Sequence, residues 1–251
     1  MVSAVLFITF FVLLVLNVPI SICLGLSSAA AILYSGTSLT IVATNIYSGI
    51  SKFLLLAIPF FVLSGNIMAK AGISTRLIRF VNTCVGHRKG GIANVCIIVA
   101  CFFGAISGSG PATVAALGAV LIPAMVERGG FSAPFATALM ATASSIAIVI
   151  PPSIAFVVYA SITGVSIGDM FMAGIVPGIL MGLALIVVVM LEVHKNHVVP
   201  SNVQKASAKE RLDAFKDAFW GFLMPVIILG GIYGGIFTPT EAAAGSGVYG
   251  L

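Results

Sequence analysis

Long apolar segments separated by short polar ones run through the whole chain. An α-helix needs about 20 mainly apolar residues to cross the hydrocarbon core of a bilayer. Segments that approach or exceed this length are 53–68, 135–161, 170–191 and 219–237. Since helices satisfy their own backbone groups in lipid, the pattern predicts an all-α polytopic membrane protein.

The first third of the chain is less regular. Residues 2–34 are apolar but interrupted at Asn17-Val18-Pro19, so they predict two short helices or one strongly kinked span. Residues 35–51 mix apolar and polar side chains, which indicates a position at the membrane surface. In residues 70–81, basic side chains alternate with apolar ones and predict an interfacial helix.

Two polar segments follow in the second half. Residues 194–217 are polar and charged, and they predict a loop whose end resembles an amphipathic helix. The sequence Thr238-Pro239-Thr240-Glu241 predicts a turn, with Thr240 as the N-cap of the next helix.

The charge is low and mostly positive. Only 8% of the residues are charged, against about a quarter in soluble domains, and the formal net charge is +5. Basic residues collect in cytoplasmic loops. Placing the flanks of residues 90–127 and the loop 194–217 in the cytoplasm puts eleven of the twelve Lys and Arg on one side, with Lys52 opposite. The net charge therefore requires no acidic partner, and no interleaving of basic and aromatic residues supports nucleic-acid binding.

Side chains that carry chemistry are scarce in the apolar segments. The four cysteines include no C-x-x-C pair, so metal or disulfide chemistry is not expected. No catalytic pair or metal-ligand cluster lies within the spans, so we do not expect an enzyme. The lack of Asp, Glu and His near span centres also favours sodium coupling through backbone oxygens over proton coupling.

Two apolar segments are broken at their centres. The first break, residues 106–113, reads Ile-Ser-Gly-Ser-Gly-Pro-Ala-Thr, with about 15 apolar residues or some 22 Å of helix on each side. Because each half is short for a span, we expect a re-entrant helical hairpin over 90–127, although an ordinary pair of spans gives the same charge distribution. The second break, residues 148–154, contains Pro151 and Pro152. Either break alone has a simple structural explanation, a loop or a kink, whereas paired interruptions point to the binding site of a transporter.

The first break exposes the C-terminus of one helix and the N-terminus of the next, which carry partial charges of opposite sign. A helix ends in four unpaired carbonyls and begins with four unpaired amides. The carbonyls of residues 104–107 are therefore expected to be free to hold a cation. The amides of Ala112 and Thr113 are expected to face an anion, with the helix dipole helping. Pro111 suits the first helical turn, where its missing N–H is not needed.

The second break is predicted to leave further carbonyls in need of a partner. Pro151 and Pro152 have no N–H, which leaves the carbonyls of Ala147 and Ile148 without helical partners. The carbonyl oxygens of residues 146–150 then suit a hard cation such as Na⁺. If the two helix C-termini meet, they form one cation site.

The residues of both breaks resemble those of a known family. The run 104–125, GAISGSGPATVAALGAVLIPAM, is similar to the large membrane subunit (DctM-type) of TRAP transporters, and so are the segments 17–20, 58–66, 148–154 and 235–243. Members of this family carry two hairpin-plus-broken-helix units as an inverted repeat. Only one unit is present here, so we expect the N-terminal half of a full subunit, which would not transport alone.

The resemblance implies an elevator-type transporter in the bacterial inner membrane, in which a transport domain moves against a fixed scaffold. It assigns residues 1–85 to scaffold helices and an interfacial arm. Residues 86–165 form the transport domain, with the re-entrant hairpin and a broken helix over 134–162. Residues 166–251 hold further scaffold helices, the cytoplasmic loop and the start of the second repeat.

The resemblance also implies ligand positions. Sodium, the coupling ion and the only cofactor expected, is held by the backbone carbonyls of Gly104, Ser107, Ile146, Val149 and Pro151. The substrate is expected beside Ser107, Gly108, Ser109, Gly110, Pro111, Ala112, Thr113, Pro152 and Ser153.

Partners and substrate follow from the same resemblance. Such subunits work with a small four-helix membrane subunit and a periplasmic substrate-binding protein, and they import small carboxylates such as C4-dicarboxylates, sialic acid or sugar acids along a sodium gradient. The alternatives are a sodium–dicarboxylate symporter without a binding protein, and a non-transporting membrane scaffold or fragment.

Overall fold

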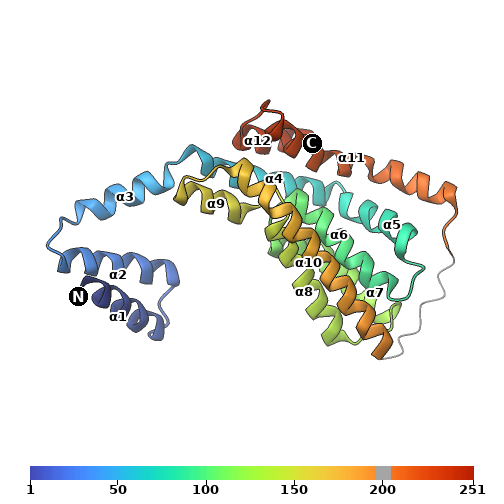
Figure 1. The fold of residues 1–251 in the computed structure, drawn as a ribbon, viewed down its shortest axis with the longest axis horizontal. Coiled ribbons are helices and arrows are strands. Elements are labelled where there is room, and N and C mark those ends of the chain that lie inside the picture. Colours follow the sequence, from blue (N-terminus) through green and yellow to red (C-terminus); the bar gives the residue numbers. More distant parts are fainter. Residues whose placement is uncertain (196–204) are drawn as a thin grey trace. The chain divides into compact units, whose positions relative to one another are not determined.

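The computed structural model describes residues 1–195 and 205–251, and every regular element in these ranges is a helix (Figure 1). The chain forms two compact units, residues 1–52 and 53–251. The prediction of an all-α protein is confirmed.

The first unit contains three short helices, α1 (Val2–Val15), α2 (Ile20–Tyr34) and α3 (Thr40–Ile50). The helices α1 and α2 pack against each other, and the turn between them places Asn17 at a positive φ of 61°. The thiol of Cys23 closes this turn by donating to the Val18 carbonyl at 3.2 Å. Of the two structures predicted for residues 2–34, the pair of short helices is correct and the single kinked span is wrong.

The second unit is a bundle around one central helix. Its elements are η1 (Phe53–Leu56), α4 (Ala57–Lys70), α5 (Ile73–Val85), α6 (Gly91–Ser107), α7 (Gly110–Glu127), α8 (Ala133–Val149), α9 (Ile154–Thr163), α10 (Ile167–Lys195), α11 (Ala208–Tyr233) and α12 (Pro239–Tyr249). Helix α6 packs against α4, α5, α7, α8, α10 and α11, and it buries 13 of its 17 residues. A helix that is apolar on all sides belongs in a core, so α6 is the element around which this unit is built.

Four described segments are long and apolar enough to cross a membrane, namely Phe53–Lys70, Gly110–Glu127, Ile167–Lys195 and Ala208–Tyr233. The pair α8 and α9 counts as a fifth if it forms one bent span. A polytopic membrane protein is therefore confirmed. The flanks of the first break are longer than the sequence indicated, at 17 and 18 residues, because α7 starts directly after Ser109 and continues through Pro123. Helix α6 is too short to count as a candidate span, as expected for one arm of a re-entrant hairpin, whereas α7 is long enough to cross the membrane.

The polar segment 194–217 ends in a helix, as predicted, and only residues 196–207 separate α10 from α11. Helix α10 continues to Lys195, and α11 begins at Ala208, so the charged residues up to Asp217 lie on the same helix as the following span. The cause is a capping box, in which the Ser207 hydroxyl accepts from the Glu210 N–H at 3.2 Å and the Glu210 carboxylate accepts from the Ser207 N–H at 2.7 Å. Residues 196–204 of the loop lie outside the described residues.

The N-cap of α12 is Thr238, and the prediction of Thr240 is wrong. The Thr238 hydroxyl accepts from the Glu241 N–H at 3.3 Å, and the Glu241 carboxylate accepts from the Thr238 N–H at 2.8 Å. The spacing Thr-x-x-Glu is that of a capping box, and Pro239 occupies the first turn, where it needs no N–H. Thr240 is buried instead.

Exchanging each threonine for its isostere valine tests this assignment. Thr238→Val removes the cap and should lower the free energy of unfolding by about 1 kcal/mol. Thr240→Val is the matched control and should change it less, because Thr240 caps no helix. Thermal unfolding of the purified protein in detergent, followed by circular dichroism, measures both. A larger loss in Thr240→Val would contradict the assignment.

The same cap predicts a pH dependence. The pKa of Glu241 lies below its ordinary value of 4.5, chiefly because the carboxylate accepts from the Thr238 N–H and secondarily from the Thr238 hydroxyl. A depressed pKa stabilises the folded state above the pKa of the unfolded chain, and this stabilisation is lost as the pH falls through the folded value. The melting temperature of wild type should therefore exceed that of Glu241→Gln at pH 7, and the gap should close below pH 4.5. A gap that does not change with pH would contradict the cap.

Candidate functional site

The first break is a two-residue turn between α6 and α7. Gly108 ends α6 in the left-handed conformation, with φ 61°, and its N–H donates to the Gly104 carbonyl at 2.8 Å. Ser109 is the N-cap of α7, and its hydroxyl accepts from the Ala112 N–H at 3.4 Å. Glycine meets the left-handed position without steric cost, and serine is a favoured N-cap, so the sequence Ser-Gly-Ser specifies this turn locally.

The second break bends the predicted span by 42° between α8 and α9. Ser153 is the N-cap of α9, where its hydroxyl accepts from the Phe156 N–H at 3.4 Å. The same hydroxyl donates to the Ile148 carbonyl. The Ile148 carbonyl thus has no helical partner, as expected, and the Ser153 hydroxyl supplies the hydrogen bond that the prolines cannot.

The two breaks lie in contact. The Ile154 N–H, in the first turn of α9, donates to the Gly108 carbonyl at 3.3 Å. A Cβ on Gly108 would lie 2.7 Å from the Pro152 carbonyl oxygen, and one on Gly104 would lie 2.6 Å from Ala147. The glycines therefore let the turn between α6 and α7 lie directly against the break between α8 and α9.

Several carbonyls predicted to hold sodium already accept hydrogen bonds. The Gly104 carbonyl accepts from Gly108, and the Ile146 carbonyl accepts from the Ile150 N–H at 2.8 Å. A Cβ on Gly174 of α10 would lie 2.3 Å from the Val149 carbonyl oxygen, so this oxygen faces that helix closely. A carbonyl oxygen has two lone pairs, so the first two keep one for a further ligand.

The amides predicted to face an anion are also engaged. The Ala112 N–H donates to the Ser109 hydroxyl at 3.4 Å, and the Thr113 N–H donates to the Ser109 carbonyl at 3.0 Å. An anion at the start of α7 therefore has to compete with the Ser109 hydroxyl, which is the weaker of these two partners by distance.

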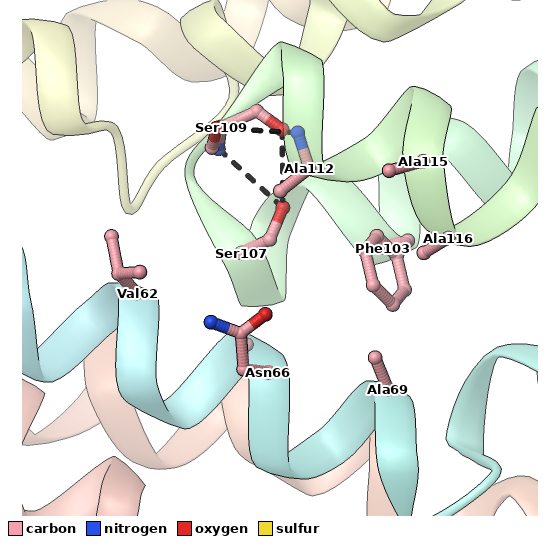
Figure 2. A pocket seen from close by; sticks show the side chains of 10 residues that line it. Val62, Asn66, Ala69, Phe103, Ser107, Ser109, Ala112, Ala115 and Ala116 are labelled. Carbon is pink, nitrogen blue, oxygen red and sulfur yellow. Dashed lines mark hydrogen bonds between the residues drawn. The ribbon is translucent and has the colours of Figure 1, made fainter.

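A cavity of ≈ 290 Å³ lies between the first break and α4. It is lined by Val62, Gly65, Asn66, Ala69, Phe103, Ser107, Ser109, Ala112, Ala115 and Ala116. Figure 2 shows Asn66 on α4 directed across this cavity toward Ser107. Three of the predicted substrate residues, Ser107, Ser109 and Ala112, line it. The size suits a small solute.

The other predicted substrate residues do not line this cavity. Thr113 is fully buried and reaches it indirectly, through a hydrogen bond of 3.2 Å between its hydroxyl and that of Ser107. Pro152 and Ser153 are buried on the side of the second break. The structure thus separates the predicted set into residues that face the cavity and residues that support the turn; the latter are Gly108, Gly110, Pro111, Thr113, Pro152 and Ser153.

Asn66 is the polar residue that the sequence interpretation missed. The available signal was an amide side chain inside the apolar span 53–68. Its neighbour Gly65 sets the distance between the helices, since a Cβ there would lie 3.1 Å from the Ser107 Cα. Close packing at Gly65 therefore places Asn66 opposite the turn.

The cavity has no charged lining residue, and the described part of the chain holds no group of three or more His, Cys, Asp or Glu that could bind a metal. Its polar groups are neutral side chains and helix ends. An all-helical membrane protein with two interrupted helices in contact beside a small, mainly apolar cavity that holds a few polar groups has the construction of a secondary transporter.

Comparison with known proteins identifies the family. Residues 7–251 match the "Tripartite ATP-independent periplasmic transporter, DctM component". The chain therefore belongs to this family of TRAP transporter large permeases, and it is a multi-pass protein of the bacterial inner membrane. Most of its relatives are named as permeases, which favours a transporter rather than an enzyme.

Three relatives show the range of the family. The chain is 45% identical to the C4-dicarboxylate TRAP transporter large permease protein DctM of Vibrio cholerae, over 99% of this chain and 55% of that protein. It is 46% identical to the isethionate TRAP transporter permease protein DctMQ of Oleidesulfovibrio alaskensis, over 98% and 39%. It is 38% identical to the 2,3-diketo-L-gulonate TRAP transporter large permease protein YiaN of Escherichia coli, over 92% and 56%. The chain thus spans about half the length of the curated relatives that it matches.

The contact between the breaks predicts an asymmetry between two glycines. Gly108 and Gly164 both end helices at positive φ, 61° and 77°, but a Cβ on Gly164 would meet nothing within 4 Å. Alanine at either position costs about 1–2 kcal/mol for the left-handed backbone. Gly108→Ala should lower the melting temperature further, because its Cβ would press on the Pro152 carbonyl. Equal melting temperatures for the two variants would show that the breaks do not touch.

Proposed function

We propose that this chain carries one of the ligand-binding units of a sodium-coupled permease that imports small organic anions, carboxylates above all. The observation that carries the proposal is the contact between the two helix breaks beside the cavity that Asn66 and Ser107 line. The substrates in the names of the three relatives are all small organic anions, which is the chemical class that two helix N-termini favour.

The carbonyls at the ends of α6 and α8 are the proposed cation ligands. They belong to Gly104, Ser107, Ile146, Val149 and Pro151. Helix C-termini carry partial negative charge, and carbonyl oxygens suit Na⁺. The close approach of Gly104 to Ala147 supports this assignment, because it brings the last turns of α6 and α8 together.

The anion is proposed to bind in the cavity between α4 and the first break. The Asn66 amide and the hydroxyls of Ser107 and Ser109 can donate hydrogen bonds to it. The apolar remainder of the lining restricts the size of the solute.

Transport requires partners and the rest of the subunit. The proposed partners are a small membrane subunit and a periplasmic binding protein, and the name of the relative DctMQ is one support for the former. The proposed movement is that of an elevator, in which residues 86–165 carry the ligands. The chain covers about half of its relatives, so transport is a property of the larger assembly.

Removing the second break tests the cation site. The double variant Pro151→Ala, Pro152→Ala restores two backbone N–H groups that can bond the carbonyls of Ala147 and Ile148. It would thereby continue α8 through the break and engage the carbonyls of Val149 and Pro151 in helical hydrogen bonds. In proteoliposomes that hold the complete transporter, the Na⁺ concentration for half-maximal uptake should rise about ten-fold, as expected from losing about 1.4 kcal/mol of binding.

Pro225→Ala is the matched control, since Pro225 lies inside α11, which packs mainly against α5 and α12. It should leave the Na⁺ dependence unchanged. Wild-type uptake that continues when K⁺ replaces Na⁺, or an unaltered Na⁺ dependence in the double variant, would refute the proposed site.

Asn66→Ala tests the anion site separately. Losing one hydrogen bond to a charged group costs about 1.5–3 kcal/mol, so the KM for the solute should rise about ten-fold or more. The Na⁺ dependence should change little, because Asn66 lies on α4 and contributes no carbonyl to the breaks. Asn45→Ala, on an exposed part of α3, serves as the control. An unchanged KM for Asn66→Ala would place the solute elsewhere.

A further inference from the structure

A second hollow lies outside the site described above, between α5 and α11. It has a volume of ≈ 490 Å³ and is lined by Thr75, Arg76, Arg79, Lys216, Asp217 and Trp220. The two helices lie side by side in Figure 1 and pack against each other. We propose that this hollow binds the phosphate of an anionic phospholipid headgroup, such as that of phosphatidylglycerol.

The first support is charge. Three of the lining side chains are basic and one is acidic, and Arg79 and Asp217 form an ion pair at 2.9 Å. Arg76 and Lys216 make no ion pair or hydrogen bond with any residue that the structure describes. The hollow therefore keeps two uncompensated positive charges, and arginine in particular matches the geometry of a phosphate.

The second support is the position of the hollow relative to the membrane. Trp220 is 59% exposed and stands near the end of the charged part of α11, which continues into a candidate membrane span. Exposed tryptophan at the end of an apolar segment is typical of the membrane–water interface. A headgroup at this depth reaches the basic side chains while its acyl chains lie along the apolar part of α11.

The third support is the way the two helices are fixed. A Cβ on Gly221 would lie 2.6 Å from the Ile73 side chain, so α5 and α11 touch closely there. Along the same contact between α5 and α11, the Phe80 ring lies against the rings of Phe215 and Phe222, with centroid distances of 5.5 and 5.4 Å. The basic residues of both helices are thus held around one hollow, and the exposed ion pair of Arg79 and Asp217, at 63% and 49% exposure, contributes little to this packing.

A free phosphate ion is the other source of the same chemistry. The exposed aromatic side chains Phe219 and Trp220, 39% and 59% exposed, lie at or beside the hollow and favour a lipid, because a soluble ion gains nothing from them. An acidic face of another protein is a different hypothesis, and the experiment below separates it.

The chain contains one tryptophan, Trp220, so its fluorescence reports on this hollow alone. The 251-residue chain is reconstituted in nanodiscs of phosphatidylcholine with increasing mole fractions of phosphatidylglycerol, one of the two lipids carrying brominated acyl chains that quench tryptophan. We expect brominated phosphatidylglycerol to quench at a lower mole fraction than brominated phosphatidylcholine does.

Charge variants make the test specific. Arg76→Gln and Lys216→Gln should each raise the mole fraction for half-maximal quenching about five-fold. Asp217→Asn should lower it, because it removes the negative charge from the hollow. Arg128→Gln, an exposed residue after α7, is the control of equal charge change and should have no effect. Circular dichroism checks that all variants keep the same helix content.

Three outcomes would overturn the proposal. Equal quenching by both lipids would show that the hollow has no headgroup preference. The remaining hypothesis would then be that its basic residues bind an acidic face of another protein. Relief of quenching by inorganic phosphate at constant ionic strength would show a site for the free ion. Weaker phosphatidylglycerol binding in Asp217→Asn would show that the ion pair between Arg79 and Asp217 maintains the shape of the hollow and that its positive charge does not attract the lipid.

Discussion

The structure of the second unit depends on the contact between two interrupted helices. One hydrogen bond, from the Ile154 N–H to the Gly108 carbonyl, joins the start of α9 to the end of α6. It forms only because Gly104 and Gly108 have no side chain in the space that Ala147 and Pro152 occupy. Since α6 is also the buried centre of the bundle, this contact positions the helix ends and, through Gly65, the cavity beside α4.

The serines at the breaks explain how a membrane protein tolerates so much irregular backbone. A backbone group without a partner is costly in lipid. Ser109 caps α7, while Ser153 caps α9 and also donates to the Ile148 carbonyl. The breaks are thus satisfied largely by their own side chains, which means that the turn and the bend can exist without a ligand.

Much of this architecture can be predicted from the sequence, and the failures share a cause. The apolar segments predict the spans, and Ser-Gly-Ser and Pro-Pro predict the breaks, because these features depend only on residues that are neighbours in the sequence. The start of α7 and the cap of α12 differ from the prediction because Ser109 and Thr238 begin these helices earlier than the apolar sequence indicates. Asn66 was missed because its role depends on the packing of α4 against the turn, which no local pattern encodes.

The neutrality of the cavity gives a physical reason for ion coupling in the proposed transporter. The cavity's described lining residues carry no formal charge, so an anion there is stabilised only by dipoles and hydrogen bonds. A cation on the neighbouring carbonyls would attract it by roughly 3 kcal/mol at about 5 Å and an effective dielectric constant near 20. This energy lies at the upper end of typical coupling free energies, and coupling is reciprocal, so each ion would raise the affinity for the other. A fixed arginine in the cavity would bind the anion without the cation and would abolish this dependence. The described residues that line the cavity include no such charge, so in the proposed transporter binding of the anion would depend on the cation.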